Sequence, residues 1–155
     1  MPEVALGDAD LIYRSKDNFS VYRFLVRKSP IVIPASKLNS LVGGLDAGAR
    51  VAADGTKGGT LTFGPYSAVD PGRYEVTIKY QSDGETGSWD IVTAARATVA
   101  KGLIPDTHGA TADIVATVDL PQGAQGLEAR TFYSGHGRLA VVSLRITPLN
   151  FFTRR

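Results

Sequence analysis

The sequence predicts an all-β fold in which two antiparallel sheets pack face to face, with at most one short helix. Segments with strand character recur about every ten residues, a spacing typical of a sandwich or a barrel. The 155-residue chain contains 17 glycines and 8 prolines, and such frequent turn residues favour many short strands over a few long helices. A chain of this length is the usual size of one domain and can bury a core without disulfides or metals.

The N-terminal part of the chain has weak strand signals. Residues 1–17 are polar and irregular, and they predict an arm or a lead-in strand. Apolar runs follow at 19–26 and 31–33. Pro30 and Pro34 bracket the second run, and proline has no N–H to donate to a neighbouring strand. We therefore expect this run to form an edge strand.

A short helix and a glycine-rich region are predicted next. Ser36 is a suitable N-cap for one or two helical turns that end at Gly43-Gly44. The apolar side chains of these turns would be Leu38, Leu41 and Val42. Residues 43–59 are rich in glycine, which predicts a loop or weak strands.

From residue 60 onward, apolar and polar residues alternate as in strands that are buried on one face. Residues 60–66 are the first such strand, and Asp70-Pro71-Gly72 is a turn in which proline presets φ and glycine tolerates a positive φ. The clearest alternation spans residues 73–80. The apolar side chains on its inner face are Tyr74, Val76, Ile78 and Tyr80.

Further strands complete the two sheets. We expect them at 89–93, 113–120, 127–133 and 139–147. Residues 94–101 fit either a short alanine-rich helix or a strand with a bulge, and the neighbouring strand signals favour the strand. The predicted core comprises Tyr74, Val76, Ile78, Ile114, Val118, Val142, Leu144 and Ile146. Phe63 alternates with Leu61 and is expected in the core as well. The prediction is one sandwich domain over 18–149, preceded by the arm at 1–17 and followed by a tail at 150–155.

Composition and motifs argue against several classes of function. A formal net charge of +2 is too weak to indicate a nucleic-acid-binding surface, and no apolar run reaches the ~20 residues that cross a membrane. Cysteine is absent, which excludes disulfides, cysteine-bound zinc and thiol nucleophiles. We find no nucleophile elbow, zinc-binding histidine pair or phosphate-binding loop, so we expect no enzyme activity, cofactor or metal site. The N-terminus lacks the features of a secretory signal, which predicts synthesis in the cytoplasm.

A set of motifs in the second half of the chain resembles a recurring bacterial β-sandwich. The motifs are Phe63-Gly64-Pro65-Tyr66, Pro71-Gly72-Arg73-Tyr74-Glu75-Val76, Trp89-Asp90-Ile91-Val92 and the segment 127–133. They resemble the motifs of jelly-roll sandwiches of the carbohydrate-binding-module type, which are often attached to glycosyltransferases. The resemblance covers about residues 59–149. It implies a jelly-roll-like sandwich with a non-catalytic role and a glycan as its partner.

The predicted ligand site lies on the strand at 127–133. Sugar binding needs a flat apolar surface for the ring and a few convergent polar groups for its hydroxyls. Glu128, Arg130 and Phe132 lie opposite the apolar face of this strand, so Phe132 would be the platform and the charged groups would bind hydroxyls. The alternatives are that Phe132 packs under a loop, or that a register shift by one residue reverses the two faces and places Tyr133 outside instead.

Two further candidates for ligand binding come from the strand at 89–93. Trp89 is the only tryptophan, and it follows a polar loop and precedes Asp90. In this interpretation Trp89 would stack on a sugar and Asp90 would bind hydroxyls. The alternative is that Trp89 anchors the core or its rim, as a single tryptophan at the start of a strand often does.

A second hypothesis belongs to another class of function. Phe151 and Phe152 lie beyond the last predicted strand, where an exposed apolar pair is unusual on a monomer. In this hypothesis the chain is a structural assembly protein, such as a virion decoration or tail component. Residues 1–17 and 149–155 would then contact other protein subunits in a homo-oligomer or larger assembly. The alternative for the two rings is packing on their own sandwich.

Overall fold

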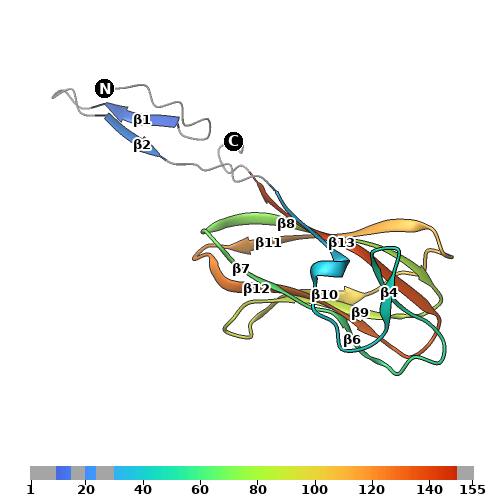
Figure 1. Ribbon diagram of the computed structural model, residues 1–155. Coiled ribbons are helices and arrows are strands. Elements are labelled where there is room, and N and C mark those ends of the chain that lie inside the picture. The colour runs from blue at the N-terminus through green and yellow to red at the C-terminus, as the bar shows by residue number, and fades with distance from the viewer. Residues whose placement is uncertain (1–9, 15–19, 24–29, 150–155) are drawn as a thin grey trace.

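The computed structural model describes residues 10–14, 20–23 and 30–149. Its strands form two antiparallel sheets that pack as a β-sandwich (Figure 1), which confirms the predicted fold class. One sheet has the order β10 (Thr98–Leu103), β9 (Gly87–Val92), β12 (Ala124–Tyr133) and β6 (Gly59–Thr62), and β7 (Pro65–Val69) also pairs with β12. We call it the five-stranded sheet.

The second sheet has six strands. Its order is β11 (Thr111–Leu120), β8 (Gly72–Asp83), β13 (Arg138–Leu149), β5 (Ala49–Ala52) and β4 (Gly44–Asp46), and β3 (Ile31–Pro34) also pairs with β13. Among the described strands β3 pairs with β13 alone, as expected for an edge strand bracketed by two prolines.

The N-terminal strands form a unit of their own. β1 (Asp10–Arg14) pairs antiparallel with β2 (Ser20–Arg23). Within the described part of the chain, neither strand pairs with a strand of the sandwich. The predicted arm at 1–17 thus contains one strand of a hairpin, and the predicted tail at 150–155 lies outside the described residues.

The core lies between the two sheets and follows the alternation of the long strands. On β8, Tyr74, Val76, Ile78 and Tyr80 are all buried. From the same sheet come Ile114, Val118, Leu144 and Ile146, as predicted. The five-stranded sheet contributes Leu61, Ile91, Leu127, Ala129 and Tyr133. The tyrosine hydroxyls find acceptors at the core boundary: that of Tyr80 donates to the carbonyl of Pro105 at 3.0 Å.

The prediction that Val142 faces the core is wrong, because β13 contains a bulge. Val141 pairs with Tyr80 and Ser143 pairs with Lys79, so Val142 is an extra residue in the ladder. Such a residue changes which side chains face inward. Val141 is buried in the position expected for Val142, and Val142 is only half-buried.

The strand predicted at 60–66 is divided into β6 and β7. The break follows Thr62: Phe63 forms an isolated bridge with Asn39, and the Gly64-Pro65 peptide is cis. Both parts then pair with β12. Because Phe63 leaves the alternation of β6, its side chain is half-buried and lies outside the core cluster, so the prediction of a core role is wrong.

The predicted helical turns are shorter than expected. Only Ala35–Lys37 forms a helix, a 3₁₀ turn (η1) that has Pro34 as its N-cap and no side-chain cap. The backbone N–H groups of Leu41 and Val42 donate to the carbonyl of Thr60 instead of to a preceding helical turn. This contact with β6 replaces the helix.

Candidate functional site

The outer face of the five-stranded sheet carries the predicted platform residue. On β12 the buried side chains are Leu127, Ala129, Thr131 and Tyr133. The intervening Glu128, Arg130 and Phe132 are half-buried and point away from the core. The reversed register, with Tyr133 outside, is therefore not the one that forms.

Neighbouring strands extend this face in two rows. Arg130 of β12 lies opposite Asp90 of β9, which in turn lies opposite Lys101 of β10. In the next row, Phe132 lies opposite Ser88, and Ser88 lies opposite Leu103. Adjacent strands are about 4.8 Å apart, so the side chains in each row are near neighbours across the sheet.

A fixed guanidinium lies at the centre of this face. Arg130 Nε donates to Asp90 Oδ1 at 2.7 Å, and an Arg130 Nη donates to Asp90 Oδ2 at 2.6 Å. The guanidinium carbon is 5.1 Å from the centroid of the Phe132 ring, within the range of a cation–π contact. Hydrogen bonding to Asp90 raises the pKa of Arg130 above its usual range. The carboxylate accepts two of the five N–H groups of the guanidinium, and the carboxylate and the ring together hold the guanidinium in place.

Tyr66 joins this group from β7, and the sequence analysis did not identify it. Its neighbour Pro65 pairs with Glu128, and Tyr66 itself is 50% exposed. Partial desolvation, followed by a hydrogen bond with Glu128, raises the pKa of the Tyr66 hydroxyl. Its backbone φ is +64°, an uncommon conformation for a tyrosine. The available signal was the tyrosine directly after Gly64-Pro65, a pair that marks a turn.

Trp89 lies apart from the other four predicted site residues. It is opposite Thr131, whose buried side chain is on the inner face of the sheet. The indole packs against the core cluster and over Gly102 of β10. The structure thus brings together Asp90, Glu128, Arg130 and Phe132 on one face and places Trp89 on the other.

We expect Gly102→Ala to destabilise the fold by about 1–3 kcal/mol, the usual cost of overpacking. A Cβ at this position would be 2.9 Å from Nε1 of Trp89. Because the indole would have to move, its fluorescence should change together with the urea midpoint. Gly44→Ala is the control, since a Cβ at Gly44 meets no atom within 4 Å. Equal midpoints for the two variants would contradict this packing.

No group of three or more His, Asp or Glu side chains arranged to hold a metal occurs in residues 10–14, 20–23 and 30–149. In the same residues no helix is long and apolar enough to cross a membrane.

Comparison with known proteins relates this chain to others by fold. No protein-family model and no curated protein matches the sequence. The C-terminal CBM6 of LamC, a marine laminarinase from Zobellia galactanivorans, has a TM-score of 0.56 and 14% identity over 77% of this chain and 99% of that chain. The CBM35 of Abf62 from Cellvibrio japonicus has a TM-score of 0.51 and 19% identity over 79% of this chain and 95% of that chain.

A third match comes from a much larger protein. The insecticidal delta-endotoxin Cry8Ea1 of Bacillus thuringiensis has a TM-score of 0.50 and 16% identity over 77% of this chain but only 24% of its own. At these identities the comparisons show the fold. The chain is a β-sandwich similar to carbohydrate-binding modules, so the predicted likeness is confirmed at the level of the fold.

Proposed function

We propose that this protein is a non-catalytic module that binds a glycan on the outer face of its five-stranded sheet. The observation that carries the proposal is the Phe132 ring beside the Arg130–Asp90 pair on one accessible face. A sandwich similar to carbohydrate-binding modules supports it at the level of the fold. Attachment to a glycosyltransferase, which the sequence resemblance implies, stays a prediction.

Each side chain of this face has a role in the proposal. The Phe132 ring takes the apolar C–H face of a sugar, and the remaining N–H groups of Arg130 donate to its oxygens. Glu128 accepts from sugar hydroxyls, and Tyr66 extends the aromatic surface at the β7 edge. Asp90 acts mainly through Arg130, because both of its oxygens are engaged by the guanidinium.

A glycan array probed with the labelled 155-residue chain tests this proposal. Titration calorimetry then measures the affinity for each glycan that binds the chain on the array. Binding at micromolar to millimolar concentration is the expected result. Absence of binding to every glycan at millimolar ligand would overturn the proposal.

A second candidate function, structural assembly through the termini, is favoured by the N-terminal hairpin. β1 and β2 pair only with each other among the described strands, and an isolated two-stranded hairpin is marginally stable in water. A neighbouring subunit would supply the missing contacts. Residues 1–9, 15–17 and 150–155 lie outside the described part of the chain, so the contacts predicted for them stay predictions.

Deletion of residues 1–29 distinguishes this function by its effect on solution mass. For an assembly protein, the full chain should form an oligomer and the deleted chain a folded monomer, since the sandwich begins at β3. Sedimentation equilibrium measures the mass, and circular dichroism checks that the fold persists. A full chain that is monomeric at all concentrations would exclude assembly through the hairpin.

A further inference from the structure

A groove opens at the end of the five-stranded sheet, next to the proposed glycan site. It has a volume of about 330 Å³, and its lining includes Ser88, Leu103, Glu85, Asp106 and Ser134. Ser88 and Leu103 are also the neighbours of Phe132 in the second row of the sheet face. The groove is therefore continuous with the platform.

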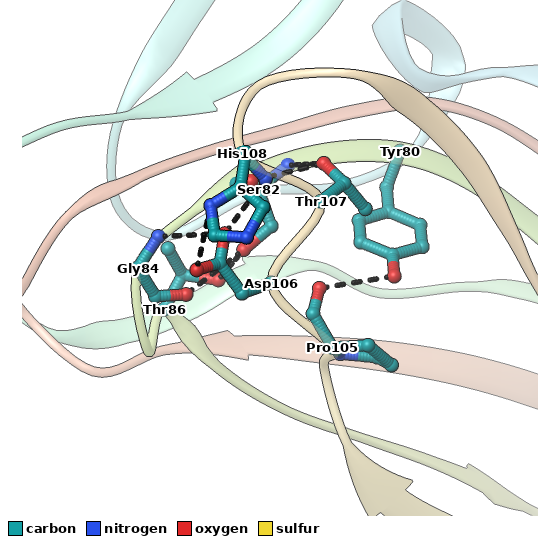
Figure 2. A network of polar contacts seen from close by, with 8 residues as sticks. All are labelled: Tyr80, Ser82, Gly84, Thr86, Pro105, Asp106, Thr107 and His108. Atoms are coloured by element: carbon teal, nitrogen blue, oxygen red, sulfur yellow. Dashed lines mark hydrogen bonds and ion pairs between the residues drawn. The ribbon is translucent and has the colours of Figure 1, made fainter.

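The wall of this groove that carries Asp106 is held rigidly (Figure 2). Asp106 Oδ1 accepts from the backbone N–H groups of His108 at 2.8 Å and Gly84 at 3.1 Å. These hydrogen bonds, that of His108 first, lower the pKa of Asp106 below its usual range. The segment is also tied to β8, because Thr107 Oγ1 donates to the carbonyl of Ser82 at 2.9 Å and accepts from its N–H at 2.9 Å. A ligand would thus meet a carboxylate that is already positioned.

The lining of the groove also has an apolar, exposed part. Leu103 ends the edge strand β10 and is 80% exposed, the highest value among the large apolar side chains of the described residues. Two strand spacings of about 4.8 Å separate it from Phe132. One sugar ring on Phe132 would leave Leu103 uncovered, whereas a chain of linked rings would reach it.

Charge indicates which chain the groove accepts. Glu85 and Asp106 are both acidic, and among the described residues no lysine or arginine lines the groove. On the platform the two positive charges, Arg130 and Lys101, are matched by the two negative charges of Asp90 and Glu128. Carboxylate or sulfate groups on a ligand would therefore be repelled, while sugar hydroxyls can donate to the two acidic side chains.

We propose that the binding site extends from Phe132 into this groove and selects an uncharged oligosaccharide over a single sugar, a disaccharide or an acidic glycan. This inference deepens the proposed function and rests on it. Leu103 contacts a sugar ring that lies beyond the ring on Phe132, and the negative charges of Glu85 and Asp106 repel anionic chains.

The test uses the 155-residue chain and titration calorimetry. The probes are a disaccharide and a hexasaccharide of each of the neutral glucans, xylans and mannans, together with an oligogalacturonate as the acidic probe. Each hexasaccharide that binds should do so at least about tenfold more tightly than its disaccharide. Leu103→Ala should lower hexasaccharide affinity by about tenfold, because it removes one apolar contact, and should change disaccharide affinity by less than about twofold. Val115→Ala is the matched control, since Val115 is 54% exposed on the outer face of the other sheet.

Charge selection is tested by the double variant Glu85→Gln, Asp106→Asn. Asparagine retains an oxygen that can accept the backbone N–H groups of His108 and Gly84, so the groove should keep its shape. The double variant should gain affinity for the oligogalacturonate and keep its affinity for neutral chains within about threefold.

The outcomes separate this inference from the proposed function. Equal affinity for disaccharide and hexasaccharide, or an unchanged hexasaccharide affinity in Leu103→Ala, would overturn the extended site while the platform stands. Tight binding of the oligogalacturonate by the unaltered protein would overturn the charge selection. Loss of binding only in Phe132→Ala would restrict the site to the platform, and no binding of any probe would overturn both proposals.

Discussion

Phe132→Ala is expected to abolish glycan binding while leaving the melting temperature nearly unchanged. The ring is half-buried on the outer face of β12 and contributes nothing to the core cluster. Its removal takes away the aromatic surface beside the Arg130 guanidinium, which lies 5.1 Å from the ring centroid. A loss of about 1.4 kcal/mol already weakens binding tenfold. Titration calorimetry on a glycan retained by the unaltered protein measures this loss, and differential scanning calorimetry measures the stability.

Arg130→Ala should weaken binding to the same extent, because it removes the donors aimed at sugar oxygens and leaves Asp90 without its partner. The Asp90 side chain is only 15% exposed, so a modest loss of stability should accompany the loss of binding. Arg130→Lys should not restore binding, since an ammonium cannot make the two-point contact with Asp90.

Arg73→Ala is the matched control for Arg130→Ala. Arg73 Nε donates to Asp119 Oδ1 at 2.6 Å on the outer face of the six-stranded sheet. The two partners are 45% and 65% exposed, and such surface pairs contribute about 0–1 kcal/mol to stability. Glycan binding should be unchanged in this variant. If Phe132→Ala or Arg130→Ala unfolds the protein, or if Arg73→Ala also loses binding, the assignment of the site to the five-stranded sheet is wrong.

Leu144→Ala is expected to lower the free energy of unfolding by about 2–5 kcal/mol. Leu144 is 2% exposed and packs between the sheets from the central strand β13. The substitution removes buried apolar surface and leaves a cavity that the neighbouring strands can fill only in part. Since whole domains are stable by only about 5–15 kcal/mol, this is a large fraction of the total.

Urea denaturation monitored by circular dichroism measures this loss. Val115→Ala serves as the control: this residue is an apolar β-branched side chain on the outer face of the same sheet, and its removal should change stability by about 0.5 kcal/mol or less. A larger loss for Val115→Ala than for Leu144→Ala would mean that the six-stranded sheet presents its other face to the core, and similar losses would contradict the burial of Leu144 alone.

The register of β12 illustrates what alternation can predict. Leu127, Ala129 and Tyr133 share a face because successive side chains in a strand point to opposite sides. One buried face therefore places Glu128, Arg130 and Phe132 outside. Three of the five candidate site residues share a face for this reason, and the fourth, Asp90, joins them through the pairing of β9 with β12. Trp89 was assigned from its neighbouring loop, and the pairing of β9 with β12 places it on the inner face.

The failures have a different origin. Val142 follows the apolar alternation of its segment, yet the bulge at this position lies in the pairing of β13 with β8, which the segment alone does not show. Residues 36–42 have a capping residue and helical spacing, but the carbonyl of Thr60 takes the N–H groups that a helix would have used. In both places a contact with a segment distant in sequence overrides the local preference.

The sequence by itself determined the fold class, most strand positions and the composition of the core, because hydrophobic alternation and turn residues are local properties of the chain. Only the tertiary structure decided which strands are neighbours. That decision aligns Arg130 with Asp90, 40 positions apart, brings Tyr66 to Glu128, and sets Leu103 beside the groove. Strand order depends on how two sheets bury a common core, a property of the whole chain that no single segment carries.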